Sequence, residues 1–341
     1  MPKYYKVAED IEKYNNAWLY MVVGGRSTGK TYNALCDCLD QNRRFLFVKR
    51  TIKDVSLLCS KNSDRLSPFK PINRDRCINI ETKLLCEGFG GFFDGDELIG
   101  YVGALTGIGK FTGFDLSDCD WIIFDEFIPR KWDRVFQSEG DQLLDLYMTV
   151  NRDRQIRGFR PTTLICLANS TSISCPTNNA LMVTDIFGDM IASGEDIHYD
   201  EDKGIFIHML EHNDISEALK QSQFYKAVEG TPFASMAFDN EFSRDDTSAV
   251  GAVSLKGYRC KACVIYQLRK YYIYRKGRNY FVSLSPAPTN NIYNLDHEID
   301  QRSFQIDYQI NLKYATIEGN CIYEKFSVYD MIMNFNKYFK V

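Results

Sequence analysis

The chain has 341 residues and a net charge of −4, which is enough length for two domains that each bury a core. A composition of 45% hydrophobic and 25% charged residues with nine prolines excludes wholesale disorder, and no apolar run approaches the roughly 18 residues that span a bilayer. Because the N-terminus lacks an apolar signal core, we expect a cytosolic chain without a membrane partner, whose eleven cysteines are reduced.

The first predicted element is a buried strand, "WLYMVVG", followed by a loop and a helix with an apolar face over 30–41. The loop "GGRSTGKT" fits the phosphate-binding pattern G-x-x-x-x-G-K-[ST], so we expect it to bind ATP with Mg²⁺. In this pattern Lys30 reaches the β and γ oxygens, and the Thr31 hydroxyl coordinates the metal. The predicted nucleotide-binding residues of the loop are Gly24, Gly25, Arg26, Ser27, Thr28, Gly29, Lys30 and Thr31.

A second strand, "RFLFVKR", ends at Lys49 and Arg50, which we expect near the nucleotide base or ribose. The alternative is that both are ordinary surface charges. Residues 78–105 alternate around glycine and Asp-Gly turns, which predicts short antiparallel strands.

A third core strand, "CDWIIFDEF", carries two acids at its end. We expect Asp125 to be the second magnesium ligand, because the carboxyl ends of parallel strands face the phosphates. Glu126 then lies beyond the metal ligand and is placed to polarise the attacking water as general base. The alternative is an acidic strand terminus without a catalytic role.

A helix over "GDQLLDLYMTVNRDR" leads into an arginine-rich loop and then the strand "TTLICLANST". Arg152 or Arg154 is a candidate for an arginine that enters a neighbouring subunit's site and stabilises transition-state charge. A solvated basic loop is the competing interpretation. Asn169, at the strand end, is predicted to contact the γ-phosphate or the water, unless it only begins a turn.

Strands separated by helices predict an α/β fold with a mostly parallel sheet in domain 1–195. We expect an acidic, partly helical linker at 196–232 and a smaller, strand-rich domain at 233–341. Residues 247–295 contain no Asp or Glu, so their basic side chains predict a nucleic-acid surface, unless they pair with the acidic segment before them. The predicted nucleic-acid residues are Lys256, Arg259, Lys261, Arg269, Lys270, Arg275, Lys276 and Arg278.

In this order, "GGRSTGKT", "FVKRT", "WIIFDEF", "NRDRQIR" and "LICLANS" resemble the genome-packaging ATPases of tailed bacteriophages, in particular the encapsidation proteins of small short-tailed phages. The resemblance implies a P-loop NTPase domain of the ASCE type and a second, smaller domain of RNase H-like α+β fold. It also implies a homomeric ring, a pentamer, that acts in the host cytoplasm on the portal of a procapsid and translocates double-stranded DNA inward. A structural packaging RNA is an equal candidate for the basic surface.

Larger relatives of this kind carry a metal-dependent nuclease in the second domain. Here only Asp296, Glu298 and Asp300 offer clustered acids, so we do not expect nuclease activity. Two other functions stay open at this point: a switch ATPase such as a helicase loader, and a nucleotide-binding structural protein without turnover.

Overall fold

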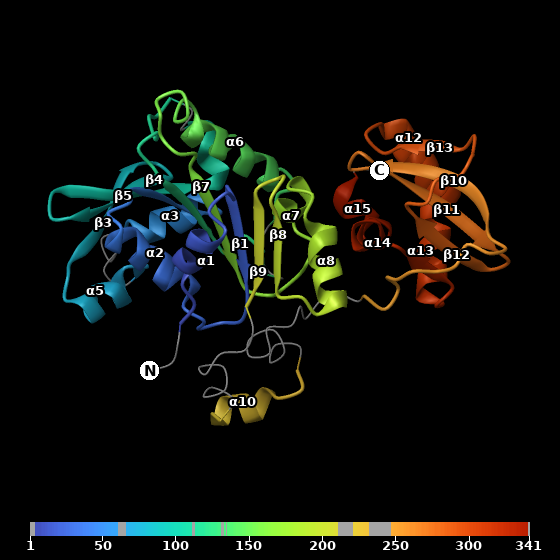
Figure 1. Ribbon diagram of the computed structural model, residues 1–341, viewed down its shortest axis with the longest axis horizontal. Helices are drawn as coiled ribbons and strands as arrows, with labels where there is room; N and C mark the ends of the chain where they lie inside the picture. The colour runs from blue at the N-terminus through green and yellow to red at the C-terminus, as the bar shows by residue number, and fades with distance from the viewer. Residues whose placement is uncertain are drawn as a thin grey trace. The chain divides into compact units, whose positions relative to one another are not determined.

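The computed structural model describes residues 4–60, 66–110, 113–130, 133, 135–210, 221–231 and 247–339. The chain divides into two compact units (Figure 1). The first unit comprises Met1–Thr177 and Gly194–Arg244, and the second comprises Asn178–Ser193 and Asp245–Val341. Along the described part of the chain, no helix is both long enough and apolar enough to cross a bilayer.

The first unit is built on a sheet whose strand order is β3-β4-β5-β2-β6-β7-β1-β9-β8. From β5 through β9 in this order, the strands pair with one another in parallel. They are β5 (Glu97–Ala104), β2 (Phe45–Lys49), β6 (Trp121–Asp125), β7 (Thr163–Ala168), β1 (Leu19–Val23) and β9 (Ile205–Met209). The predicted α/β fold with a mostly parallel sheet is therefore confirmed.

Helices cover this sheet because its parallel strands are apolar on both faces. Val22, Phe47 and Ile165 pack in one core with Ala34 and Leu35 from the helix that follows β1. Right-handed crossovers from β1 to β2 and from β6 to β7 put the intervening helices on opposite faces. The helices are α1 (Val7–Lys13), α2 (Lys30–Asp40), α3 (Ile52–Leu58), α5 (Lys70–Arg76) and α6 (Glu139–Asn151), with a 3₁₀ turn, η1, at Leu105–Lys110.

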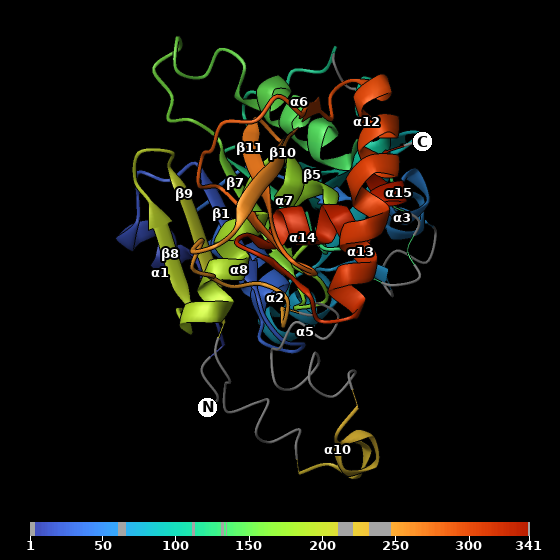
Figure 2. The same cartoon turned by 90° about the vertical axis from the view of Figure 1, so that its right-hand side faces the viewer.

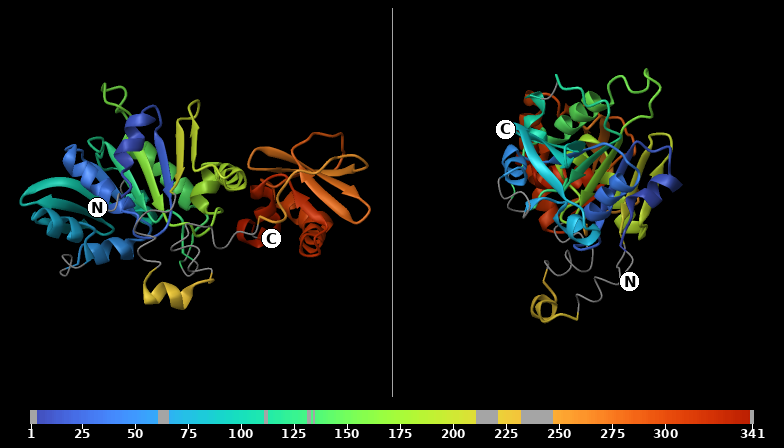
Figure 3. Two further views of the ribbon diagram at one scale, coloured as in Figure 1. Left: turned by 60° about the horizontal axis from the view of Figure 1, so that its bottom comes forward. Right: turned by 90° about the vertical axis from the view of Figure 1, so that its left-hand side faces the viewer.

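Antiparallel strands complete both edges of the sheet. At one edge β3 (Ile80–Cys86) and β4 (Phe89–Asp94) continue from β5, which confirms the antiparallel strands predicted over 78–105. At the other edge β8 (Ile197–Asp200) pairs antiparallel with β9, in yellow beside β1 in Figures 1 and 3.

The structure divides the chain differently from the predicted domain boundaries. The predicted linker 196–232 contains β8 and β9, because Ile205, Phe206 and Ile207 are buried in the sheet despite the acidic residues around them. Within this stretch, the described residues form one helix, α10 (Gln223–Val228). Conversely, α8 (Thr184–Ser193) lies before residue 195 but belongs to the second unit, as does most of α7 (Pro176–Ala180).

The second unit packs helices on one side of a sheet with the order β13-β10-β11-β12-β14. β10 (Arg259–Tyr266), β11 (Arg269–Lys276) and β12 (Asn279–Ser283) form an antiparallel meander, while β13 (Ile292–Asn294) and β14 (Cys321–Tyr323) are parallel to the strands they pair with. Figure 2 shows α12 and α13 in line along its helical side. Besides α8 and most of α7, the described helices of this unit are α12 (Glu298–Phe304), the π-helical turn η2 (Gln305–Gln309), α13 (Ile310–Ile317), α14 (Phe326–Met333) and α15 (Phe335–Tyr338).

Candidate nucleotide site

The loop between β1 and α2 forms the floor of the candidate site. Gly29, at the N-cap of α2, has a φ of 86°, and a side chain there would be strained and would press on the Tyr4 ring. Gly24, at the other end of the loop, lies so close to Leu210 that a Cβ would come within 2.8 Å of the Leu210 Cβ. Gly29 is thus required by its backbone conformation and Gly24 by the close approach of the Leu210 side chain, and the loop delivers the positive end of α2 to the site.

Lys30 is folded into this loop. Its Nζ donates hydrogen bonds to the carbonyl oxygens of Gly24 at 3.0 Å and Gly25 at 2.7 Å and to Thr28 Oγ1 at 2.9 Å. Burial lowers the pKa of Lys30 to about 7, against an opposing effect of the Asp125 carboxylate. The ammonium is therefore held at the loop by acceptors that are only partial charges, and an anionic ligand would stabilise its charged form.

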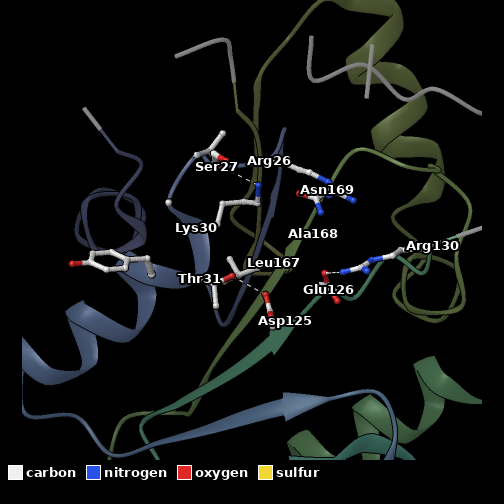
Figure 4. Close-up of a pocket in the computed structure, with 13 residues that line it drawn as sticks. Arg26, Ser27, Lys30, Thr31, Asp125, Glu126, Arg130, Leu167, Ala168 and Asn169 are labelled. Atoms are coloured by element: carbon white, nitrogen blue, oxygen red, sulfur yellow. Dashed lines mark hydrogen bonds and ion pairs between the residues drawn. The ribbon is translucent and has the colours of Figure 1, made fainter. Parts of the chain in front are cut away.

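The loop opens onto a cavity of ≈ 330 Å³ (Figure 4). Lys30 and the backbone of the loop lie on one side of it, and the Asp125 and Glu126 carboxylates lie on the other, with Arg130 beside Glu126. Such a cavity fits a polyphosphate that carries a divalent cation. It is lined by Arg26, Ser27, Thr28, Gly29, Lys30, Thr31, Tyr32, Asp125, Glu126, Arg130, Leu167, Ala168 and Asn169.

Asp125, the last residue of β6, is held by two partners. Thr31 Oγ1 donates a hydrogen bond to its Oδ1 at 2.8 Å, and Lys49 Nζ lies 2.6 Å from its Oδ2. Thr31 and Asp125 are the hard oxygen ligands that Mg²⁺ prefers, and the structure brings them together as the sequence predicts. No group of three His, Cys, Asp or Glu side chains in the described ranges could hold a metal ion, so a cation here would need further oxygens from a bound phosphate.

Glu126 follows in a conformation that is rare for its residue type. Its φ is 60°, in the left-handed region, and its side chain is 40% exposed. The carboxylate points into the cavity and forms an ion pair with Arg130 (Figure 4). Arg130 is not among the predicted site residues, although a basic residue four positions after the acid is a usable signal.

The strand β7 lies between the loop strand β1 and the acidic strand β6. Leu167 pairs with Asp125 on one side, and Ala168 pairs with Val23 on the other. Asn169, the next residue, consequently lines the cavity between the loop and Glu126. This is the position expected of a side chain that contacts a terminal phosphate or its attacking water.

Lys49 and Arg50 line a second cavity, which shares Asp125, Glu126 and Arg130 with the cavity of the loop. A contact of Lys49 with the base or ribose stays a prediction. Lys49 pairs with Asp125, and neither residue lines the cavity of the loop. Arg50 is buried. Its guanidinium contacts the Glu139 carboxylate at 2.9 Å and the Asp133 carboxylate at 3.3 Å, and donates to the carbonyl oxygens of Glu126 and Phe127, each at 3.1 Å. A buried guanidinium needs such acceptors, so Arg50 fixes the segment after β6 and is not placed to contact a base or ribose.

Of the two candidate arginines of the 152–160 loop, one is buried and the other is exposed. Arg154 is 3% exposed, forms an ion pair with Asp120 at 2.6 Å and donates to the carbonyl oxygens of Ser117 and Arg160. This buried position excludes Arg154 as an arginine that reaches a neighbouring subunit. Arg152, at the end of α6, is exposed.

The basic residues predicted to bind nucleic acid lie on β10, β11 and the turns beside them. Arg269 is engaged, because its guanidinium is 2.6 Å from the buried Asp185 carboxylate of α8. Arg269 therefore has a structural partner in this unit, and its side chain is still 38% exposed, so its nucleic-acid role stays a prediction. Seven others are exposed: Lys256, Arg259, Lys261, Lys270, Arg275, Lys276 and Arg278. Of the clustered acids Asp296, Glu298 and Asp300, Asp300 accepts a hydrogen bond from the Asn294 backbone N–H at 2.9 Å. This contact fixes the start of α12.

Comparisons with known proteins agree on one family. The family model described as Podovirus DNA encapsidation protein (Gp16) matches residues 3–316. The DNA packaging protein of Bacillus phage B103 is 26% identical over 233 residues, 67% of this chain and 65% of that protein. The DNA packaging protein of Bacillus phage phi29 is 23% identical over 232 residues, 67% of this chain and 63% of that protein, so each match spans less than two thirds of the relative's length. A chain in the bacteriophage Phi-29 viral genome packaging motor assembly superposes with a TM-score of 0.65 at 18% identity, covering 98% of both chains, which shows a common fold.

Proposed function

Because this chain belongs to the podovirus DNA encapsidation protein (Gp16) family, we propose that it hydrolyses ATP to translocate double-stranded DNA into a viral procapsid. The observation that carries the proposal is the position of Glu126, whose carboxylate lines the same cavity as the Lys30 loop, Asp125 and Asn169. This arrangement holds a phosphate chain on one side and offers a base for water on the other.

The roles of the side chains follow from where they lie. Lys30 and the backbone N–H groups of the loop bind the phosphates, and Arg26 and Arg130 add positive charge to the same cavity. Mg²⁺, held by Thr31 and Asp125, would neutralise charge on the phosphates. Glu126 accepts a proton from water as the water oxygen bonds to the γ-phosphorus and the bond to the β-phosphate oxygen breaks. Asn169 orients that water or senses the terminal phosphate.

The topology of both units supports the finer fold assignment. Placing β7 between β1 and β6 is the arrangement expected of an ASCE-type P-loop ATPase. In the second unit, an antiparallel meander with β13 added parallel to its first strand is the arrangement expected of an RNase H-like domain. Since β10 carries no acidic residue, we propose that this domain binds nucleic acid and does not cleave it.

The exposed basic residues of the second unit support contact with DNA or a structural RNA. Arg259 and Arg275 are cross-strand partners in the β10–β11 pair, and like charges directly opposite each other destabilise a sheet. A surface that accepts this cost is suited to a polyanion. We further propose that the protein acts as a homomeric ring, a pentamer, on the portal of a procapsid in the host cytoplasm, with Arg152 contributed in trans.

Glu126→Gln tests the proposal, because it removes the base and keeps the size of the side chain. We expect ATP turnover to fall by about 10²- to 10⁴-fold while ATP still binds. Glu97→Gln, an exposed acid on β5, is the matched control and should keep wild-type turnover. Stimulation of wild-type turnover by double-stranded DNA or procapsids is the second measurement. Turnover that responds to a protein partner and ignores DNA would favour a switch ATPase, and full activity of Glu126→Gln would reject the general-base role.

A further inference from the structure

The phosphate-binding loop is held from outside by the segment that precedes α1. The Tyr5 N–H donates to the Thr28 carbonyl oxygen at 3.1 Å, and Asn33 Nδ2, one turn into α2, donates to the Tyr5 carbonyl oxygen at 2.5 Å. The Tyr4 ring lies against Gly29. The main chain of this N-terminal segment therefore contacts both the loop and the first turn of the helix that carries Lys30 and Thr31.

The other end of the loop is held by the end of β9. Val22 and Val23 pair with His208 and Met209, and the Leu210 N–H then donates to the Val23 carbonyl oxygen at 2.8 Å. The Leu210 side chain packs on Gly24, where the loop begins. After Leu210 the chain runs on, in sequence, toward the second unit.

One buried carboxylate joins these two contacts. Asp10, on α1, is 9% exposed, and its Oδ2 accepts a hydrogen bond from the Tyr5 hydroxyl at 2.7 Å. The same oxygen lies 2.7 Å from His208 Nδ1, and the Tyr5 and His208 rings meet edge to face with centroids 5.5 Å apart. Burial and the Asp10 carboxylate raise the pKa of Tyr5 well above its ordinary value, so its hydroxyl stays a donor.

We propose that Tyr5, Asp10 and His208 are positioning residues that brace the phosphate loop against the end of β9 and transmit changes in the loop to that strand. The inference rests on the proposed function, because it takes the loop as the place where ATP binds. None of the three residues lines the nucleotide cavity, so each acts through the backbone of Thr28 or through the packing of Leu210. Because Tyr5 and His208 share one acceptor oxygen of Asp10, their two contacts are interdependent. If either side chain is removed, Asp10 reorients toward the one that remains.

Hydrogen exchange of the full chain, with and without Mg-ATP, tests the brace. In the wild type we expect ATP to slow exchange in residues 24–31 and also at the end of β9, in residues 205–210. Tyr5→Phe removes the hydroxyl and keeps the ring, so exchange of 24–31 without ATP should rise and the ATP effect on 205–210 should disappear. We expect ATP affinity to fall by roughly three- to tenfold, as for loss of one ordinary intramolecular hydrogen bond. His208→Asn should also remove the effect on 205–210.

Tyr20→Phe is the matched control, because Tyr20 on β1 also donates a buried hydroxyl, to the Tyr14 carbonyl oxygen at 2.7 Å. A merely structural role of Tyr5 predicts that both variants lose stability and keep the wild-type exchange pattern. An ATP effect on 205–210 that survives in Tyr5→Phe and in His208→Asn would overturn the brace. A wild type that binds no ATP would instead reject the proposed function, and the exchange of 24–31 without ATP would still decide the brace.

Discussion

Lys49 forms an ion pair with Asp125, with 2.6 Å between Nζ and Oδ2, while the other carboxylate oxygen accepts the hydrogen bond of Thr31. Both groups are largely buried, with 20% and 13% of their side chains exposed. The lysine thus neutralises the carboxylate that is expected to hold the metal. A cation at Asp125 would compete with Lys49 for the same negative charge.

Lys49→Met should therefore lower the Mg²⁺ concentration that gives half-maximal ATP turnover, by several-fold, because Asp125 loses its competing cation. The KM for ATP at saturating Mg²⁺ should change little. Lys49→Arg keeps the charge and is the control. If Lys49 instead contacted the base or ribose, Lys49→Met would raise the KM for ATP and leave the Mg²⁺ dependence unchanged.

The buried ammonium of Lys30 predicts a pH dependence of ATP binding. Its pKa is about 7 without ligand, and bound phosphates would raise it, so the charged form that binds ATP is present below pH 7 and is lost as the pH rises. ATP affinity should fall above pH 7 by up to about tenfold per pH unit until the pKa of the complex is reached. Calorimetry at pH 8 in two buffers of different ionisation enthalpy should detect uptake of a proton. Lys30→Arg, whose guanidinium stays charged, should show no uptake, and zero uptake by the wild type would contradict the prediction.

The sequence predicted the parts of the site that depend on local pattern. The phosphate-binding loop, the acidic end of β6 and Asn169 each lie at the carboxyl end of a buried parallel strand. Parallel strands place their carboxyl ends at one edge of the sheet. The order of β1, β7 and β6 then brings these residues into one cavity.

The roles of charged side chains could not be predicted from the sequence where burial determines those roles. The local sequence around Arg50 and Arg154 predicts exposed cations, but both side chains are buried. Arg50 pairs with Glu139 and Arg154 with Asp120, which are distant in sequence. Arg269 likewise pairs with Asp185, across 84 positions. No periodicity within a segment reports such long-range pairs. The apolar strand β9 was not predicted, because acidic residues surround it in the sequence. Burial of its side chains in the sheet stabilises the strand despite these acidic neighbours.

Arg50→Ala should destabilise the first unit strongly. It would leave Glu139, which is fully buried, without its cation, and breaking a buried pair in this way costs about 3–5 kcal/mol. The midpoint of urea unfolding measures the loss. Arg44→Ala is the control, since the Arg44–Asp118 pair is exposed and such a pair is worth about 0–1 kcal/mol. Weaker ATP binding with unchanged stability would restore the interpretation of Arg50 as a nucleotide contact.

Arg152→Ala and Arg154→Ala should have different effects. Arg154→Ala should lower stability, because it leaves Asp120 and two carbonyl oxygens without their donor. Arg152→Ala should keep stability and lower DNA-stimulated turnover by roughly 10³-fold or more if Arg152 acts on a neighbouring site. Mixing this variant with wild-type protein should then inhibit more than in proportion to its share. Arg157→Ala, an exposed residue of the same loop, is the control, and full activity of Arg152→Ala would reject the trans role.

The basic surface of the second unit can be tested through the salt dependence of binding. Each phosphate contact contributes about 0.9 to the slope of log affinity against log salt for duplex DNA. Replacing Lys270, Arg275 and Lys276 by alanine should therefore flatten this slope by up to about 2.7, since these side chains are exposed on β11. Arg269 is kept in this variant because it pairs with Asp185.

Arg302→Ala with Lys313→Ala is the control for the same measurement. Both residues are exposed, but they lie on α12 and α13, on the helical side of this unit (Figure 2). Their removal lowers the positive charge without touching the β10–β11 surface, so the slope should keep its wild-type value. Measuring duplex DNA and a folded RNA in parallel identifies which polyanion the surface binds. Changes of slope in proportion to the charges removed, three in one variant and two in the other, would mean that net charge, and not this surface, determines binding.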